Sequence, residues 1–257
     1  MFYFLVYNDD THKDNINTLL ESVKKYGTSF QIIVFEKNNI DKEFVWKYDA
    51  ILSCERGGGY WLWKSYIINE TLKNLKNDDV LFYLDSKYYF IAYFMNFIEE
   101  CLRASEFVVW KNKPNEPTFY MKNWCKMDVI QKFKMTDTVF THNAEDCWGG
   151  AILLKKTDST IKYINEWFTM CCDYENITDS PSKIPNDAGF TEHRHDQSLL
   201  SVIIHTYGIP LFFFEKRYLQ NVRVPFYNHS LFNYFIDICN IVLVFKPWTL
   251  CLRSNQT

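Results

Sequence analysis

Apolar runs of strand length alternate with segments of helical period along most of the chain. This alternation is typical of an α/β fold, and we expect a mostly parallel central sheet flanked by helices. The run Val80–Leu84 is apolar without alternation, as expected of a strand covered on both faces. The predicted strands are Phe2–Tyr7, Phe30–Phe35, Val80–Leu84, Phe107–Trp110, Ala151–Leu154 and Leu211–Phe214.

The segments between these strands predict helices. Helical spacing is clearest in Tyr60–Lys76, and a second helix is predicted over Ser159–Cys172. A third is predicted from Gln197 to about His205, with Asp196 placed to cap its first backbone amides. Asp179–Gly189 contains two prolines and ends on glycine, so we predict a loop that acts as a mobile lid.

Two apolar segments, Tyr88–Ile98 and Leu231–Phe245, are shorter than the roughly 20 residues that a spanning helix needs. The second belongs to residues 216–257, which we treat as a C-terminal extension of a domain formed by residues 1–215. We expect the extension to pack on the core as a helix, and peripheral attachment to a membrane is the alternative.

The amino-acid composition of the chain argues against some classes of function. The chain has 257 residues, of which 47% are hydrophobic, so it can bury a sizeable core. Its formal net charge of -3 argues against a nucleic-acid binder. None of its eight cysteines forms a CxxC pair, which indicates buried thiols in a reducing, cytoplasmic setting rather than a zinc ribbon. The apolar N-terminus is predicted to be a strand rather than a signal peptide.

The segment Arg56–Ser65 combines three consecutive glycines with flanking basic residues. Glycine permits backbone geometries that bring the chain close to a ligand, and Arg56 and Lys64 supply positive charge. This combination suggests a site for a phosphate-bearing ligand. Of the aromatic residues nearby, Tyr60 is the one we expect at the ligand, because it adjoins the glycines.

Asp85 follows the strand Val80–Leu84, and ligand crevices of open α/β sheets lie at the carboxyl ends of strands. A carboxylate there can hold a divalent cation together with phosphate oxygens, although Asp85 can also simply cap the next helix. Gly149 and Gly150 precede the strand Ala151–Leu154. Their amides either approach a ligand or form an ordinary turn.

A second cluster of polar residues runs from Glu192 to Gln197. Its histidines, His193 and His195, are two positions apart and therefore do not form the helical i, i+4 zinc pair. The position of the cluster directly after a proline-containing loop suggests that it grips a sugar. Capping by Asp196 is the simpler interpretation.

Together these motifs resemble a family. GYWLWK at residues 59–64, the strand ending Tyr83-Leu84-Asp85, and HRHDQS at residues 193–198 are similar to a little-characterised group of GT-A-type nucleotide-sugar glycosyltransferases found in polysaccharide-synthesis loci and large viruses. The resemblance extends from about Phe2 to Phe214. It implies a GT-A (nucleotide-diphospho-sugar transferase) fold and a catalytic domain over residues 1–215.

The resemblance also implies site residues. Asp85, with His195, would hold a Mn2+ or Mg2+ ion that bridges the donor diphosphate, and Asp196 and Gln197 would face the reacting centre. The donor site would comprise Arg56, Gly59, Tyr60, Lys64, Asp85, Lys87 and Gly150. Lys87 is a departure, because many such enzymes carry a second aspartate there and related sequences of the group carry glycine. Lys87 can itself neutralise phosphate, which would reduce the dependence on metal.

The function implied is transfer of a sugar from a nucleotide-diphosphate donor to a glycan or other hydroxyl acceptor. A nucleotidyltransferase would need a glycine-rich basic signature after the first strand, and Asn8–Lys13 contains no glycine. A catalytically silent carbohydrate-binding or assembly subunit with the same fold is the other alternative, and Lys87 is the feature that favours it.

Overall fold

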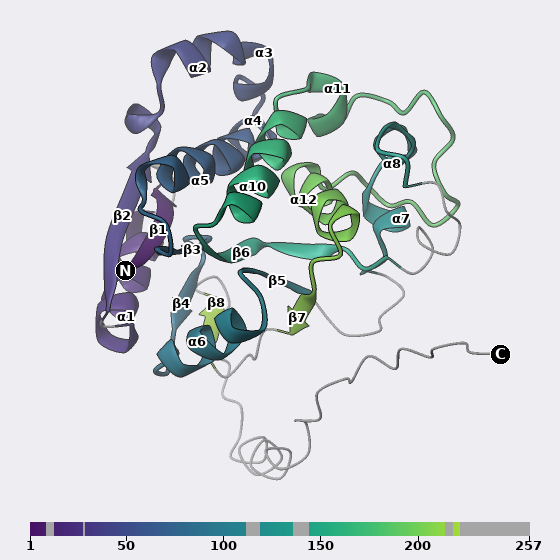
Figure 1. The fold of residues 1–257 in the computed structure, drawn as a ribbon. Helices are drawn as coiled ribbons and strands as arrows, with labels where there is room; N and C mark the ends of the chain where they lie inside the picture. The colour runs from purple at the N-terminus through teal and green to yellow at the C-terminus, as the bar shows by residue number, and fades with distance from the viewer. Residues whose placement is uncertain (9–12, 28, 112–118, 136–143, 214–217, 222–257) are drawn as a thin grey trace, which may run out of the picture. The chain divides into compact units, whose positions relative to one another are not determined.

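The computed structural model describes residues 1–8, 13–27, 29–111, 119–135, 144–213 and 218–221 (Figure 1). A six-stranded sheet forms its centre, with the order β2-β1-β3-β6-β5-β7. All neighbouring strands are parallel except β6, which runs antiparallel to β3 and β5. The strands are β1 Phe2–Asn8, β2 Phe30–Glu36, β3 Val80–Leu84, β5 Phe107–Lys111, β6 Cys147–Lys155 and β7 Leu211–Phe213. The predicted fold class, a mostly parallel sheet flanked by helices, is confirmed.

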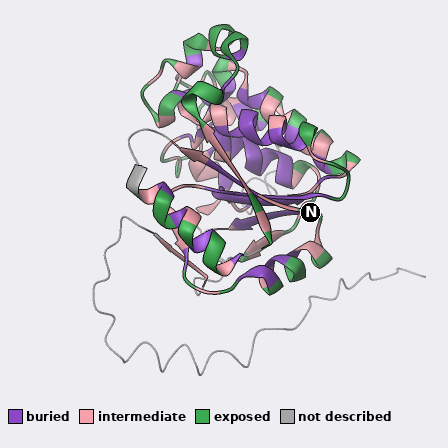
Figure 2. Ribbon diagram, turned by 90° about the vertical axis from the view of Figure 1, so that its left-hand side faces the viewer, coloured by how far each residue is buried: buried purple, intermediate pink, exposed green. Residues whose placement is uncertain are grey.

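Helices cover both faces of this sheet (Figures 1 and 2). On one face α5 (Leu62–Asn74), α10 (Asp158–Cys171) and α12 (His195–Thr206) bury their apolar residues in a single cluster. On the other, α1 (Lys13–Tyr26) and α6 (Met95–Ala104) build a second cluster. The shorter helices are η2 Lys37–Asn39, α2 Lys42–Lys47, α3 Asp49–Leu52, α4 Gly57–Tyr60, α7 Met121–Trp124, α8 Met127–Lys132 and α11 Tyr174–Ile177.

The central strand β3 shows why its sequence lacks alternation. Leu81 and Tyr83 belong to the first cluster, whereas Val80, Phe82 and Leu84 belong to the second. All five side chains are therefore buried, and the predicted bounds of this strand match the observed ones.

Three local predictions are wrong. Strand β6 begins at Cys147, so Gly149 and Gly150 lie inside the strand rather than before it. The first predicted helix begins at Leu62 instead of Tyr60, because Trp61 adopts a left-handed conformation. Helix α12 begins at His195, which makes Arg194 the N-cap residue. Asp196 is therefore not the cap, and its carboxylate contacts a lysine on another helix.

Outside the main sheet, β4 (Tyr88–Phe90) pairs antiparallel with β8 (Leu219–Asn221), a strand that belongs to the predicted extension. Within the ranges given above, no helix is both long and apolar enough to cross a membrane. The apolar segment Leu231–Phe245, with its predicted helix and membrane contact, lies outside the described residues. Asp179–Gly189 contains neither helix nor strand, as the loop prediction required.

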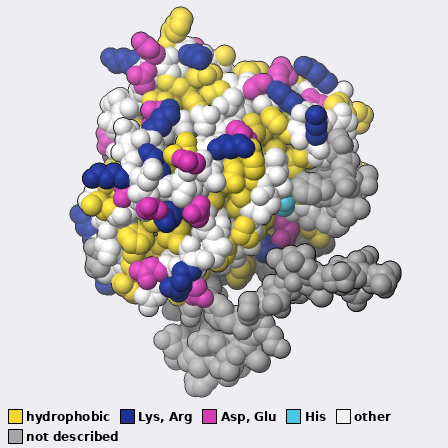
Figure 3. All heavy atoms as spheres, in the orientation of Figure 1, with side chains coloured by type: hydrophobic (Ala, Val, Ile, Leu, Met, Phe, Trp, Pro, Cys, Tyr) yellow, Lys and Arg dark blue, Asp and Glu magenta, His cyan; other side chains and the backbone are white. Residues whose placement is uncertain are grey.

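Acidic and basic side chains are interspersed on the face of the molecule that Figure 3 shows. Apolar side chains lie between them in small groups. Among the residues that the structure describes, the basic side chains on this face form no continuous stripe of the kind that tracks a nucleic-acid backbone.

Candidate active site

The three glycines of Arg56–Ser65 belong to a left-handed turn. Five consecutive residues, Gly57 to Trp61, have positive φ, with values of 61°, 59°, 91°, 53° and 60°. Tyr60 and Trp61 carry side chains, so each costs roughly 1–2 kcal/mol in this conformation. The turn is held by bonds from the Tyr60 amide to the Arg56 carbonyl (2.7 Å) and from Trp63 Nε1 to the Gly57 carbonyl (2.9 Å). Such strain persists only where the surroundings enforce it, and it is concentrated at functional sites.

The turn delivers Lys64, in the first turn of α5, to the carboxyl end of β3. Lys64 Nζ lies 3.0 Å from Asp196 Oδ2 and 3.5 Å from Asp85 Oδ1, and it donates to the Gly149 carbonyl at 3.1 Å. Its side chain is only 5% exposed. Burial opposes the ammonium charge, but the carboxylates of Asp196 and Asp85 outweigh it and raise the pKa of Lys64. A permanent buried cation therefore joins two acidic residues from different elements.

Asp85 is surrounded by donors. Tyr83 Oη donates to its Oδ1 at 2.8 Å, and Lys87 Nζ lies 3.3 Å from its Oδ2. Its backbone amide donates to the Gly150 carbonyl in β6. Burial favours the neutral acid, yet the charges of Lys64 and Lys87 prevail and lower the pKa of Asp85. Asp85 is thus an ionised carboxylate, and it does not act as a plain helix cap.

Gln197 ties α12 to the glycines of β6. Its Oε1 accepts from the Gly149 amide at 3.2 Å, and its Nε2 donates to Asp146. A side-chain carbon at Gly149 would lie 3.1 Å from Gln197 Cβ, so glycine is what allows the helix this close. Burial raises the pKa of both Asp146 and Asp196 to about 6. Each of these two carboxyl groups is therefore a weaker acid than an exposed aspartate.

Asp146 was not predicted from the sequence. It precedes β6 and accepts from Ser201 Oγ at 2.8 Å as well as from Gln197. Because β6 is antiparallel to β3, its first residues lie beside the end of β3. An acidic residue just before an apolar strand was the available signal, but it is informative only once the strand direction is known.

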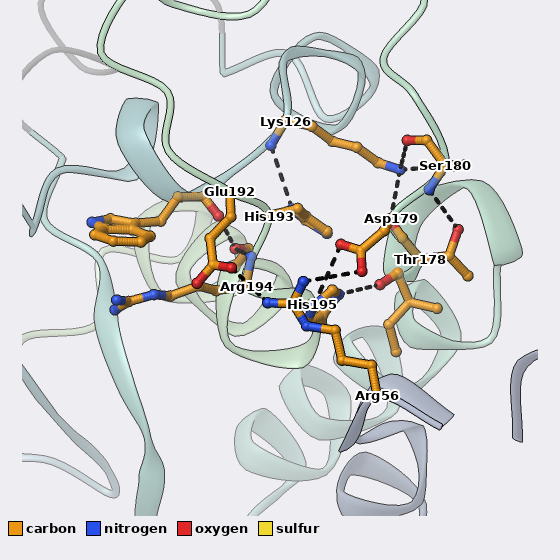
Figure 4. A network of polar contacts seen from close by, with 12 residues as sticks. Arg56, Lys126, Thr178, Asp179, Ser180, Glu192, His193, Arg194 and His195 are labelled. Atoms are coloured by element: carbon orange, nitrogen blue, oxygen red, sulfur yellow. Dashed lines mark hydrogen bonds and ion pairs between the residues drawn. The ribbon is translucent and has the colours of Figure 1, made fainter. Parts of the chain in front are cut away.

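A second network contains two more of the predicted residues, Arg56 and His195 (Figure 4). Arg56 forms ion pairs with Asp179 (3.0 Å) and Glu192 (2.6 Å). His195 Nε2 lies 3.7 Å from Asp179, and the His195 ring lies 4.7 Å from that of Tyr60. The network therefore links the left-handed turn to both ends of the loop that precedes α12.

Buried side chains fix the start of that loop, and the helix α11 before it, through hydrogen bonds. Lys126 Nζ donates to the Thr178 carbonyl at 3.1 Å and to Ser180 Oγ at 3.0 Å, while His193 and His195 bond the carbonyls of residues 176 and 177. Burial lowers the pKa of Lys126 and of both histidines. Since the two histidines bond backbone carbonyls of α11, we interpret them as positioning groups.

The structure thus separates the predicted residues into two groups. Lys64, Asp85, Lys87, Gly150, Asp196 and Gln197 come together at the end of β3, whereas Arg56, Tyr60 and His195 gather around Asp179. Gly59 lies inside the turn, where a side-chain carbon would fall 2.6 Å from Leu52 Cα.

A divalent metal held by Asp85 and His195 does not fit this arrangement. Both oxygens of Asp85 face ammonium groups, and His195 faces Ile177 and Asp179. The residues that the structure describes contain no group of three or more His, Cys, Asp or Glu side chains able to hold a metal ion.

A cavity of about 530 Å³ lies elsewhere, lined by Asp128, Gln131, Lys132, Asp173, Glu175, Asn176, Lys183 and Ile184. None of these residues belongs to the cluster around Lys64. Its charged groups pair with one another, as Lys132 does with Asp173 at 2.6 Å. We place the candidate site at Lys64 instead, because there buried charges of both signs converge at the end of a central strand.

Comparison with solved structures identifies the type of fold. The bifunctional glycosyltransferase WbbM matches 84% of this chain, over 39% of its own length, with a TM-score of 0.50 and 10% identity. The fold is of the GT-A type. Galactosyltransferase LgtC, solved with donor and acceptor sugar analogues, matches 78% of this chain and 70% of its own, with a TM-score of 0.45 and 12% identity. Mouse xyloside xylosyltransferase 1 matches 84% of each chain, with a TM-score of 0.46 and 8% identity.

No protein-family model matches the sequence, and no curated protein matches it. At 10% identity, the match to WbbM shows the fold alone. The activity therefore has to be argued from the side chains of the site.

Proposed function

We propose that the protein is a glycosyltransferase that moves a sugar from a nucleotide-diphosphate donor to a glycan or other hydroxyl acceptor. The observation that carries the proposal is the Lys64 cluster: a buried ammonium between Asp85 and Asp196 at the carboxyl end of β3, in a GT-A-type fold. The position of the cluster in the sheet suits a ligand site, and the cation that can meet a phosphate there is Lys87, which lies beside Asp85.

Transfer requires the bond between the anomeric carbon and the donor's diphosphate to break. Negative charge then develops on the leaving phosphate, and preformed cations stabilise it. Lys87 is half-exposed beside Asp85 and is available for this contact, while Lys64 keeps Asp85 and Asp196 ionised and in place. Gly150 is the residue that we assign next to the donor sugar, although a side-chain carbon at this glycine would lie only 2.5 Å from Trp148 Nε1.

Asp196 is the residue that we assign to the acceptor side. With a pKa raised by burial to about 6, it is mostly ionised at neutral pH yet more basic than an exposed aspartate. Such a carboxylate serves as general base in an inverting reaction or stabilises a cationic sugar in a retaining one. Gln197 fixes its helix to β6 through Gly149.

The test is release of nucleoside diphosphate from a panel of UDP-, GDP-, ADP- and dTDP-sugars with mixed glycan acceptors. We expect turnover of one nucleotide class by the wild type, and loss of at least 100-fold in Asp85→Asn. Asp78→Asn is the matched control, because Asp78 is a 75% exposed carboxylate paired with Lys155 on the surface. Wild-type turnover by Asp85→Asn would disprove the site assignment.

A catalytically silent binding subunit is the second candidate, favoured by the ion pair between Lys87 and Asp85. It predicts sugar binding without turnover by any donor. Cytoplasmic location and peripheral membrane contact through residues 216–257 also remain proposals, which rest on the cysteine spacing and on the apolar segment near the C-terminus.

A further inference from the structure

Both oxygens of the Asp85 carboxylate already face cations supplied by the chain. Oδ1 lies 3.5 Å from Lys64 Nζ and accepts from Tyr83 Oη, and Oδ2 lies 3.3 Å from Lys87 Nζ. The two lysines come from different elements, α5 and the loop after β3. Asp85 therefore sits between two positive charges before any ligand arrives.

The two lysines differ in access. The Lys64 side chain is 5% exposed, whereas the Lys87 side chain is 37% exposed. Lys87 is also held in place, because its ammonium lies 5.3 Å from the centre of the Tyr88 ring, which packs edge-on against Trp148 at 5.1 Å. Lys87 is thus an anchored cation that an incoming anion can reach.

A divalent cation is hard to place at the same carboxylate. Mn2+ and Mg2+ need several oxygen ligands, and Asp196, the other carboxylate beside Lys64, is itself bound to that lysine. An ion at Asp85 would also lie next to two ammonium groups, which would repel it strongly in a partly buried site. Binding a metal would require at least Lys87 to leave.

We propose that Lys87 takes the place of the divalent metal in the donor site, so that the diphosphate binds without one. This inference rests on the proposed function. Lys87 Nζ, with three N–H donors, bonds the phosphate oxygens directly, and Lys64 balances Asp85 and Asp196 beneath it.

The experiment is calorimetric titration of UDP, GDP, ADP and dTDP into the full chain in EDTA, in Mg2+ and in Mn2+. We expect one nucleotide to bind with a dissociation constant that differs by less than about 3-fold among the three conditions. Binding that appears only with metal would overturn the inference and leave the proposed function intact. No binding of any nucleotide in any condition would overturn both.

Variants identify the lysine responsible. Lys87→Met should weaken nucleotide binding in EDTA by about 10-fold to 100-fold, the loss of one charge-assisted bond, while Lys87→Arg retains most of it. Lys87→Asp should bind only when Mn2+ or Mg2+ is present. Lys47→Met is the control, since Lys47 is likewise followed by a tyrosine whose ring it contacts, at 5.2 Å, but it lies in α2.

Ligand-free thermal unfolding checks that each variant is folded. Unchanged affinity of a folded Lys87→Met variant in EDTA would contradict the role of Lys87. Metal-independent binding by Lys87→Asp would contradict it as well.

Discussion

Replacing Lys64 by Met should destabilise the protein by about 3–5 kcal/mol, because removal of one partner leaves a buried charge uncompensated. The magnitude follows from the surroundings. The carboxylates of Asp196 and Asp85, which lie 3.0 Å and 3.5 Å from Lys64 Nζ, are only 4% and 18% exposed. Methionine keeps the apolar stem of the lysine, so the measured change reports mainly on the charge.

The loss should depend on pH. Burial raises the folded pKa of Asp196 to about 6, above its ordinary 3.8, so its contribution to stability is fully present below pH 3.8 and is lost as the pH rises through 6. Without Lys64 this pKa rises further, and the protonated acid persists to higher pH. The destabilisation should therefore be large at pH 7.5 and smaller at pH 5.

Urea unfolding followed by circular dichroism measures both effects. Lys73→Met is the matched control on the same helix, since Lys73 forms an exposed pair with Glu70 that is worth less than about 1 kcal/mol. Lys64→Met combined with Asp196→Asn should recover part of the loss. The reasoning is refuted if Lys64→Met costs no more than the control, or if its cost is the same at both pH values.

Three further predictions concern the surroundings of the site. Gly58→Ala should lower the free energy of unfolding in urea by about 1 kcal/mol, because alanine is strained at the positive φ of this residue. Gly59→Ala should lower it by at least about 3 kcal/mol, because the added carbon would also collide with the backbone of Leu52; equal losses would contradict this. Burial raises the pKa of Asp146 from 3.8 to about 6, so wild-type stability relative to Asp146→Asn should fall by about 2 kcal/mol as the pH rises from 4 to 7, and a flat difference would exclude a buried acid. Glu192→Gln breaks an exposed ion pair with Arg56 and should lower the melting temperature by less than about 4 °C, a difference that vanishes in 1 M salt if it is electrostatic.

The sequence predicts best where local pattern and tertiary environment agree. The unbroken apolar run Val80–Leu84 identified a strand buried on both faces, and Asp85 directly follows it, beside Lys64; its part in donor binding stays a prediction. The three glycines signalled unusual backbone, but nothing marked Tyr60 and Trp61 as left-handed, because residues with side chains normally avoid that region.

What the sequence misses depends on long-range partners. Asp196 has the local chemistry of an N-cap, and only the folded chain brings Lys64 to it. The sequence suggests that Arg56 can bind phosphate, but in the folded chain its guanidinium forms ion pairs with Asp179 and Glu192. Asp146 and the glycines of β6 join the site because that strand runs antiparallel, and strand direction is not encoded in a run of apolar residues.

The late position of β6 in the chain also affects how the protein folds during its synthesis. During synthesis β1, β2 and β3 emerge first and can pair, but both strand partners of β5 in the described sheet, β6 and β7, come later in the chain. Until residues 147–155 leave the ribosome, β3 presents an unpaired apolar edge and β5 has no neighbouring strand. A nascent chain halted before that point is the form most exposed to aggregation, and binding by chaperones should be strongest there.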